Sequence, residues 1–154
     1  MIDSSKMTLK KVIHEHPSLI CVEAEMGGRT LEIASAYAPS DPQERITFFN
    51  DINTKQLLSV NTFVRGDWNV VEDVTIDVDS ANPLAYDNMG IQALRNALDP
   101  LGLIDIRREQ LHNKREYSRG GNTRNGYTST RIDRWYVPDI DDLLQTAGMT
   151  NEFL

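Results

Sequence analysis

Three observations predict a layered domain of the α/β or α+β class. Short apolar runs bounded by glycine recur along the chain, and two of the segments between them carry apolar residues at helical spacing. The length of 154 residues suits one domain with its own core. An apolar content of 40% and a charged content of 25% are those of a globular chain rather than a disordered one. Strands with intervening helices, and no internal repeat or linker, favour a layered arrangement.

The N-terminal part of the sequence predicts a β-hairpin. The first twelve or so residues have no pattern of their own. Residues 19–25 have the composition of a strand, and a second strand is expected from about Thr30 to Tyr37. Gly27 and Gly28 lie between them and are typical of the tight turn that joins two antiparallel strands.

A helix is predicted to follow from Asp41 to about Leu58. Asp41 is a suitable N-cap, Pro42 fits the first helical position and Glu44 the third. Its buried face is expected to hold Ile46, Phe49, Ile52 and Leu57.

The next strand is short and ends in polar residues. Residues 62–64 predict a buried strand, and Gly66 is expected to break it so that the backbone turns sharply. Because side chains alternate along a strand, Asp67 and Asn69 would share one face. A carboxylate and a carboxamide placed together can act on a phosphate, one through a proton or a metal-bound water and the other through hydrogen bonds. The same tetrapeptide also fits an ordinary Asx turn.

The second half of the sequence continues the alternation of strands and helices. Its predicted elements are an acidic loop at 72–83, a helix at 87–99 with Ile91, Leu94 and Leu98 on its apolar face, a strand at 103–106, an exposed basic loop at 109–126, a strand at 130–137, and a short terminal helix from Asp139.

Charge is unevenly distributed along the chain, which has a net charge of −7. Residues 107–134 hold eight of the sixteen basic residues and three acids, whereas residues 72–87 hold five acids and no base. Such segments fit an enzyme that holds a cation and a phosphate backbone together, and they fit solvated loops equally well. Asp73, Asp77 and Asp79 lack the spacing of an EF-hand, which favours a solvated acidic loop over a calcium site.

Other features exclude several classes of protein. Cys21 is the only cysteine, so we expect a small buried side chain in an intracellular (nuclear or cytoplasmic) protein rather than a zinc site or a catalytic thiol. No run approaches the roughly 20 apolar residues of a membrane span, and residues 1–6 lack the apolar region of a secretory signal. A membrane partner is therefore not expected.

Several motifs occur in a recognisable order. Residues 35–39 (Ser-Ala-Tyr-Ala-Pro) close a predicted strand, 66–69 (Gly-Asp-Trp-Asn) close the next, and 129–137 contain Ser-Thr-Arg-Ile-Asp followed by an apolar end. Residues 103–107 and the pair Tyr117 and Ser118 lie between them. This set resembles the endonuclease/exonuclease/phosphatase (DNase I-like) superfamily, especially the nuclease domain of LINE-type retrotransposons. The resemblance covers about residues 19–137 and implies a partial four-layer α/β sandwich of mixed, mainly antiparallel sheets with outer helices.

The resemblance also implies roles for individual residues. Tyr37 would lie beside the scissile phosphate, Asp67 would orient or deprotonate the attacking water, and Asn69 would bind a phosphate oxygen. Asp133 would fix the tautomer of a catalytic histidine. A Mg²⁺ ion would neutralise phosphate charge and act as a Lewis acid.

DNA is the partner that the resemblance implies. The basic segment supplies the candidate nucleic-acid contacts Arg107, Arg108, Ser118, Arg119 and Arg131, of which Ser118 is also expected to contact the backbone of the last strand. Arg131 and its neighbours also fit a surface charge ladder. Trp68 and Trp135 fit core or rim packing better than base stacking.

The sequence departs from the family pattern at both ends. The family's Gln-Glu pair, whose Glu is the principal metal ligand, is expected before residue 19, and its Ser-Asp-His after residue 137; neither is found. His14 and His16 match no family position and are expected at the surface. The prediction is a single partial domain over residues 1–154, a truncated nuclease fragment that is inactive or weak alone and could self-associate through uncovered sheet edges. A non-catalytic nucleic-acid-binding relic, and a phosphatase-branch enzyme, remain alternatives.

Overall fold

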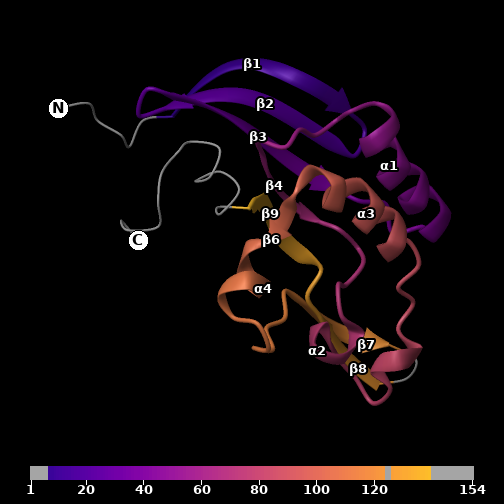
Figure 1. Ribbon diagram of the computed structural model, residues 1–154. Coiled ribbons are helices and arrows are strands. Elements are labelled where there is room, and N and C mark those ends of the chain that lie inside the picture. Colours follow the sequence, from indigo (N-terminus) through magenta and orange to yellow (C-terminus); the bar gives the residue numbers. More distant parts are fainter. Residues whose placement is uncertain (1–6, 124–125, 140–154) are drawn as a thin grey trace.

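A six-stranded sheet forms the centre of the computed structural model, which describes residues 7–123 and 126–139 (Figure 1). The strands lie in the order β1-β2-β3-β4-β9-β6, and within this sheet β3 and β4 pair in parallel while the other neighbours are antiparallel. They are β1 (Met7–His16), β2 (Leu19–Met26), β3 (Arg29–Tyr37), β4 (Thr62–Asp67), β6 (Leu103–Asp105) and β9 (Asp133–Pro138). The predicted α/β class is confirmed.

Two helices, α1 (Pro42–Thr54) and α3 (Ile91–Leu98), lie side by side on one face of this sheet (Figure 1). Phe49, Ile52, Leu94 and Leu98 from these helices are buried in one cluster with Val64 of β4. The expected apolar faces of both helices are therefore correct in their central residues. None of the helices in the described ranges is long and apolar enough to cross a bilayer.

The ends of both helices follow local chemistry. The Asp41 carboxylate accepts hydrogen bonds from the backbone N–H groups of Gln43 (2.9 Å) and Glu44 (3.0 Å), which confirms the predicted cap. The helix ends at Thr54 rather than near Leu58, and Gln56 follows in a left-handed conformation (φ 50°). α3 begins after Gly90 (φ 103°) rather than at Asp87.

The N-terminal hairpin is confirmed, whereas the strand before it was not predicted. Gly27 and Gly28 both have positive φ, as a two-residue hairpin turn requires. β1 extends the sheet from Met7, although its residues gave no periodic pattern. Most of β1 is exposed and two register shifts interrupt its pairing with β2, so its side chains do not alternate between a core and solvent.

Two segments predicted as loops are structured instead. The acidic segment forms α2 (Val74–Asp77) and β5 (Val78–Asp79), and the basic segment contains β7 (Arg119–Thr123), which pairs with β8 (Gly126–Thr130). These strands make a small second sheet in the order β5-β8-β7. The remaining short elements are η1 (Pro83–Ala85), η2 (Asp99–Leu101) and α4 (Ile106–Gln110). β7 and β8 were not predicted because they are largely exposed, so their glycine and polar residues show no alternation of apolar side chains.

The predicted strand over residues 130–137 is divided between the two sheets. β8 ends at Thr130 and β9 starts at Asp133, with Arg131 buried at the break. The guanidinium of Arg131 donates from Nε to Asp77 (2.8 Å) and from Nη2 to Asp105 (2.6 Å). Asp77 is fully buried, so the prediction of a wholly solvated acidic loop is wrong. The expected terminal helix beyond Asp139 lies outside the described residues.

The side chains of Cys21, Trp68 and His16 lie partly or fully inside the protein. Cys21 is buried, as predicted, and burial raises the pKa of its thiol to about 11. Trp68 is fully buried in the core. His16 was expected at the surface, but it stacks on Phe48 (5.4 Å between ring centres) and hydrogen-bonds Asp51.

Candidate functional site

Three of the predicted catalytic residues lie at adjacent strand ends. Tyr37 pairs in register with Asp67 across β3 and β4, and Asp67 pairs with Asp133 across β4 and β9. Residues in register point to the same side of a sheet, so all three side chains lie on the face opposite α1 and α3. Tyr37 and Asp133 are exposed, and Asp67 is partly buried between them.

Asp67 carries a perturbed carboxylate. Partial burial raises its pKa, and so does the negative charge of Asp133. The backbone N–H of Asn69, which donates to Asp67 Oδ1 (3.0 Å), lowers this pKa, as do the positive charges of Arg119 and Arg134. The net shift is upward, so Asp67 accepts a proton more readily than an ordinary aspartate.

Asn69 connects the ends of two strands. It adopts a left-handed conformation (φ 51°), and its Nδ2 donates to the carbonyl of Ala38 (2.7 Å). The backbone N–H of Ala38 in turn donates to the carbonyl of Asp67 (2.8 Å). The Asx turn formed by Asp67 and Asn69 thus coexists with the juxtaposition of the strand ends. The amide nitrogen of Asn69 holds the loop after β3 against the loop after β4.

Gly66 has a different role from the one predicted. It lies inside β4 and has no positive φ, so it does not turn the chain. A Cβ at this position would lie 2.9 Å from the Cβ of Ala36, closer than real Cβ contacts. Glycine is needed here because β3 and β4 approach closely, which brings Tyr37 and Asp67 together.

Ser118 positions the start of β9. Its Oγ accepts hydrogen bonds from the backbone N–H groups of Ile132 (3.1 Å) and Asp133 (3.0 Å), and its own N–H donates to the carbonyl of Thr130. This is the backbone contact expected of Ser118. Through it, the segment before β7 fixes the place of Asp133.

The predicted basic residues divide into three groups. Arg119 is exposed, at the start of β7, and its charge acts on Asp67. Arg107 instead forms an ion pair with Glu116 (2.7 Å), and Arg108 pairs with Asp77. Arg131 is buried between two carboxylates, so the prediction that it contacts nucleic acid is wrong, and so is the alternative of a surface charge ladder.

Two functional candidates were missed from the sequence. Arg134 is buried, its Nη1 donates to the carbonyl of Val70 (2.7 Å), and its guanidinium carbon lies 5.6 Å from the ring centre of Tyr136. Its Nε and Nη2 have no hydrogen-bond partner in the described part of the chain. Tyr86 lies near Arg119 and Arg134, although burial still raises the pKa of its phenol. The alternation of side chains along β9, which turns Arg134 inward, is the sequence signal that could have identified Arg134. The sequence has no such signal for Tyr86.

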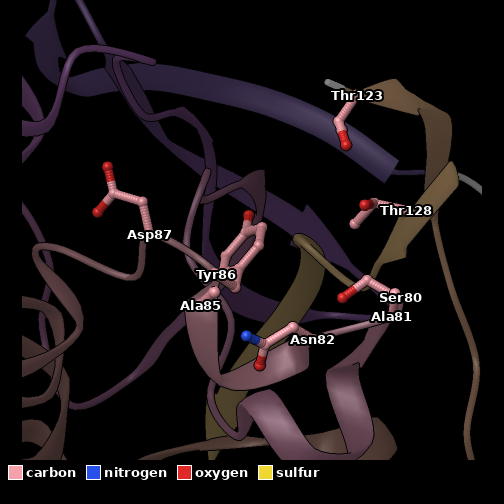
Figure 2. A pocket seen from close by; sticks show the side chains of 8 residues that line it. All are labelled: Ser80, Ala81, Asn82, Ala85, Tyr86, Asp87, Thr123 and Thr128. Carbon is pink, nitrogen blue, oxygen red and sulfur yellow. The ribbon is translucent and has the colours of Figure 1, made fainter. Parts of the chain in front are cut away.

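A pocket opens beside these groups, between the segment at 80–87 and the β7–β8 hairpin (Figure 2). It has a volume of about 370 Å³, and Figure 2 shows the ring of Tyr86 among its lining side chains, with Thr123 and Thr128 contributed by the hairpin. A neighbouring hollow of about 220 Å³ shares Tyr86 and reaches Arg119 and Thr130. The pocket is at the lower end of the usual size for small-molecule sites.

The site can be tested for its fit to the implied Mg²⁺. Within residues 7–123 and 126–139, no three His, Cys, Asp or Glu side chains are grouped to hold a metal. Asp67 and Asp133 nevertheless supply two neighbouring carboxylates. Protein sites often bind Mg²⁺ through one or two carboxylates, with water and phosphate completing the shell. The residues present therefore fit a weakly held Mg²⁺.

Solved structures of other proteins identify the fold of this chain. No family model matches the sequence, and no curated protein matches it. Among solved structures, the endonuclease domain of TRAS1, a telomere-specific non-LTR retrotransposon, is similar with a TM-score of 0.57 and 17% identity, over 89% of this chain and 58% of that domain. TDP2 of D. rerio in complex with a single-strand DNA product is similar with a TM-score of 0.52 and 14% identity, over 86% of this chain and 54% of TDP2.

These likenesses concern the fold, and the chain spans a little over half the length of either structure. The six-stranded sheet with its outer helices corresponds to part of the predicted sandwich. The chain thus has a partial DNase I-like fold, as the resemblance of its motifs to the endonuclease/exonuclease/phosphatase superfamily implied.

Proposed function

We propose that the chain carries the phosphodiester site of a Mg²⁺-dependent DNA endonuclease of the retrotransposon type, and that the chain alone cleaves DNA slowly. The observation that carries the proposal is the row of Tyr37, Asp67 and Asp133 at adjacent strand ends on a DNase I-like fold. The fold supports a nuclease by analogy, and the row of side chains supplies the chemistry.

Each side chain has a definite task in this proposal. Asp67, with its raised pKa, accepts the proton of the attacking water. The hydroxyl of Tyr37, whose side chain is 66% exposed, donates to a phosphate oxygen. The carboxamide nitrogen of Asn69 donates one N–H to Ala38, and its second N–H binds another phosphate oxygen. A Mg²⁺ ion held by Asp67 and Asp133 would supply neutralisation of the phosphate charge.

DNA is the proposed substrate because of what surrounds the acids. Arg119 offers an exposed cation beside Asp67 for the phosphate backbone. The pocket around Tyr86 can receive a nucleoside next to the cleaved bond. One of the similar structures, TDP2, is complexed with a single-strand DNA product, and another is the endonuclease domain of the non-LTR retrotransposon TRAS1.

Slow cleavage is expected from the groups that surround Asp133. The chain has three histidines, and in the part that the structure describes none donates a hydrogen bond to Asp133. The described residues therefore place no imidazole at Asp133 for the phosphate or the leaving group. Asp67 and Asp133 would hold Mg²⁺ without a third carboxylate. The same observation favours a second candidate, a nucleic-acid-binding relic without catalysis.

Nicking of supercoiled plasmid tests the proposal. The chain, the Asp67→Asn variant and a Lys55→Ala control on the outer end of α1 are compared with Mg²⁺ and with EDTA. We expect slow, Mg²⁺-dependent nicking that falls at least tenfold in Asp67→Asn and is unchanged in Lys55→Ala. Equal nicking by Asp67→Asn would contradict the proposal. DNA binding without any nicking would support the relic instead.

A further inference from the structure

Three arginines without an acid partner lie around Tyr86. Eight of the fourteen described lysines and arginines form an ion pair with a carboxylate, and six form none within the described residues. Arg45, Arg119 and Arg134 are three of these six, and the positive charge of each acts on the phenol of Tyr86. A chain with a net charge of −7 thus gathers positive charge at one place.

Two of these arginines are buried, and backbone carbonyls hold them. Arg45 is 3% exposed and donates from Nε (3.0 Å) and Nη2 (2.8 Å) to the carbonyl of Met89, three residues after Tyr86 in the chain. Arg134 is 2% exposed and donates from Nη1 to the carbonyl of Val70 (2.7 Å), while its Nε and Nη2 have no acceptor among the described residues. A buried cation without a carboxylate costs free energy, which a nearby anion can offset.

Tyr86 lies over the part of the core that Arg134 supports. It packs against the small cluster of Val71, Val78 and Ile132. Arg134 donates to the carbonyls of the residues that immediately precede Val71 (2.7 Å) and Ile132 (3.3 Å). Burial raises the pKa of Tyr86 although the three arginine charges lower it, so the phenol is protonated at neutral pH. The Tyr86 hydroxyl is therefore a hydrogen-bond donor beside positive charges.

The smaller hollow beside Tyr86 has walls that suit a phosphate. Its volume is about 220 Å³; among the described residues that line it, four carry a hydroxyl, one is Arg119 and none is an acid. The larger pocket does include Asp87, but in Figure 2 the Asp87 carboxylate and Thr128 lie on opposite sides of the Tyr86 ring. Hydroxyl groups and a guanidinium are groups that bind phosphate oxygens in other nucleic-acid sites.

Arg119 connects this hollow to the row of acids at the strand ends. It is exposed, and its charge acts on both Asp67 and Tyr86. Ser118, the residue before it, accepts a hydrogen bond from the backbone N–H of Asp133 (3.0 Å). The hollow therefore lies next to the proposed cleavage site, and a DNA strand carries phosphates at regular intervals along such a path.

We propose that the smaller hollow is a second phosphate site, in which the Tyr86 hydroxyl and the Arg119 guanidinium bind the phosphate next to the one that is cleaved. The larger pocket then holds the nucleoside between these two phosphates. Arg45 and Arg134 touch neither phosphate and supply positive charge from behind Tyr86. The site selects bonds inside a DNA strand over a bond whose nucleoside carries no further phosphate. The identification of the ligand as DNA rests on the proposed function, whereas the affinity for a phosphate does not.

Titration with inorganic phosphate, followed by NMR, tests the site without DNA or cleavage. The backbone N–H and arginine Nε–H signals are recorded for the wild type, Tyr86→Phe and Arg119→Gln. The controls are Tyr127→Phe, a tyrosine that is 63% exposed on β8, and Arg115→Gln, an exposed arginine that also has no ion pair in the described ranges. We expect the phosphate Kd to rise at least about fivefold in the first two variants, because each loses a hydrogen bond to a charged group, and less than about twofold in the controls. No phosphate binding, or equal losses in test and control variants, would overturn the site.

The same titration tests the role of the buried charge of Arg134. We expect the Nε–H signal of Arg134 to shift with the same Kd as the N–H signal of Arg119. Arg134→Lys keeps the charge and Arg134→Gln removes it, so the glutamine variant is expected to bind phosphate at least about threefold more weakly than the lysine variant. Urea unfolding checks that both variants are folded, and the wild-type signal tests the role even where a variant does not fold. An unshifted signal, or equal Kd values for the two folded variants, would overturn this role.

Single-stranded oligonucleotides distinguish DNA from free phosphate as the ligand. One neutral methylphosphonate linkage is moved along the strand, and binding in Mg²⁺ is measured by fluorescence anisotropy for the wild type and Arg119→Gln. We expect one linkage whose neutralisation weakens binding at least about fivefold in the wild type and less than about twofold in Arg119→Gln, because the two changes remove the same contact. Equal effects of every linkage in the two proteins would overturn DNA as the ligand. Absence of nicking by a chain that shows this coupling would contradict the proposed cleavage and support the site.

Discussion

At the scale of single residues, two carboxylates repel each other at the strand ends. Asp67 is partly buried and pairs in register with Asp133 across β4 and β9, and burial together with the negative charge of Asp133 raises the pKa of Asp67. Arg119 and Arg134 offset part of this repulsion. Sites that bind charged substrates often retain such unfavourable contacts at a cost in stability. This repulsion supports the proposed site at the strand ends.

This repulsion, together with the partial burial of Asp67, predicts that Asp67→Asn stabilises the fold. Asparagine can still accept the hydrogen bond from the N–H of Asn69, but it removes the buried charge. Because the pKa of Asp67 is raised in the folded state, ionisation disfavours folding, and stability is lost as the pH rises through that pKa. We expect a gain of about 0.5 kcal/mol at pH 7 after solvent screening. Urea unfolding at several pH values measures it.

The gain should vanish at a pH below the ordinary aspartate value of about 4, where Asp67 is protonated in both states. A variant that is less stable than the wild type at neutral pH would contradict this account. The hydroxyl of Ser118 also holds Asp133 in place, through the backbone N–H of Asp133, but this hydroxyl carries no charge.

At the scale of elements, the close approach of β3 and β4 brings the site residues together. Gly66→Ala is expected to destabilise the chain by about 2 kcal/mol, since the added Cβ would meet the Cβ of Ala36 at 2.9 Å and push the strands apart. Chemical denaturation gives the magnitude. A matched Gly121→Ala change on the exposed β7 strand, where nothing lies within 4 Å of the added Cβ, is expected to have a small effect. Equal effects would contradict the close-packing role of Gly66.

The link between the two sheets depends on a buried ion cluster. Arg131→Leu removes the ion pair of Asp105 and leaves the buried Asp77 with only its ion pair to Arg108, which is expected to cost about 3 kcal/mol of unfolding free energy. Arg107→Ala breaks the exposed pair with Glu116 and is expected to cost much less, because solvent screens exposed ion pairs. A small loss for Arg131→Leu in urea unfolding would refute the structural role of the cluster.

Elements with local chemistry could be predicted from the sequence, and those that depend on distant partners could not. The Asp41 cap and the two-glycine turn act within a few residues, so they identified α1 and the first hairpin. β1 is held by pairing with β2 rather than by its own periodicity. Asp77 was assigned to solvent because its partner Arg131 is distant in sequence.

At the scale of the whole molecule, the order of motifs identified the fold at an identity of only 17% to the TRAS1 domain. The resemblance assigned Tyr37, Asp67 and Asp133 to one catalytic site, and the strand register places them at adjacent strand ends. It did not predict the buried Arg134 or the pocket around Tyr86, because both arise from packing between segments far apart in sequence.

We predict that DNA binds at the strand ends rather than elsewhere on the surface of a chain with a net charge of −7. The most direct measurement is the fluorescence anisotropy of a labelled short duplex titrated with the chain, with Arg119→Glu and with Lys55→Glu, in Mg²⁺ and in EDTA. We predict Mg²⁺-dependent binding that weakens at least fivefold in Arg119→Glu and less than twofold in Lys55→Glu. No binding, or equal losses in the two variants, would contradict the assignment of this site.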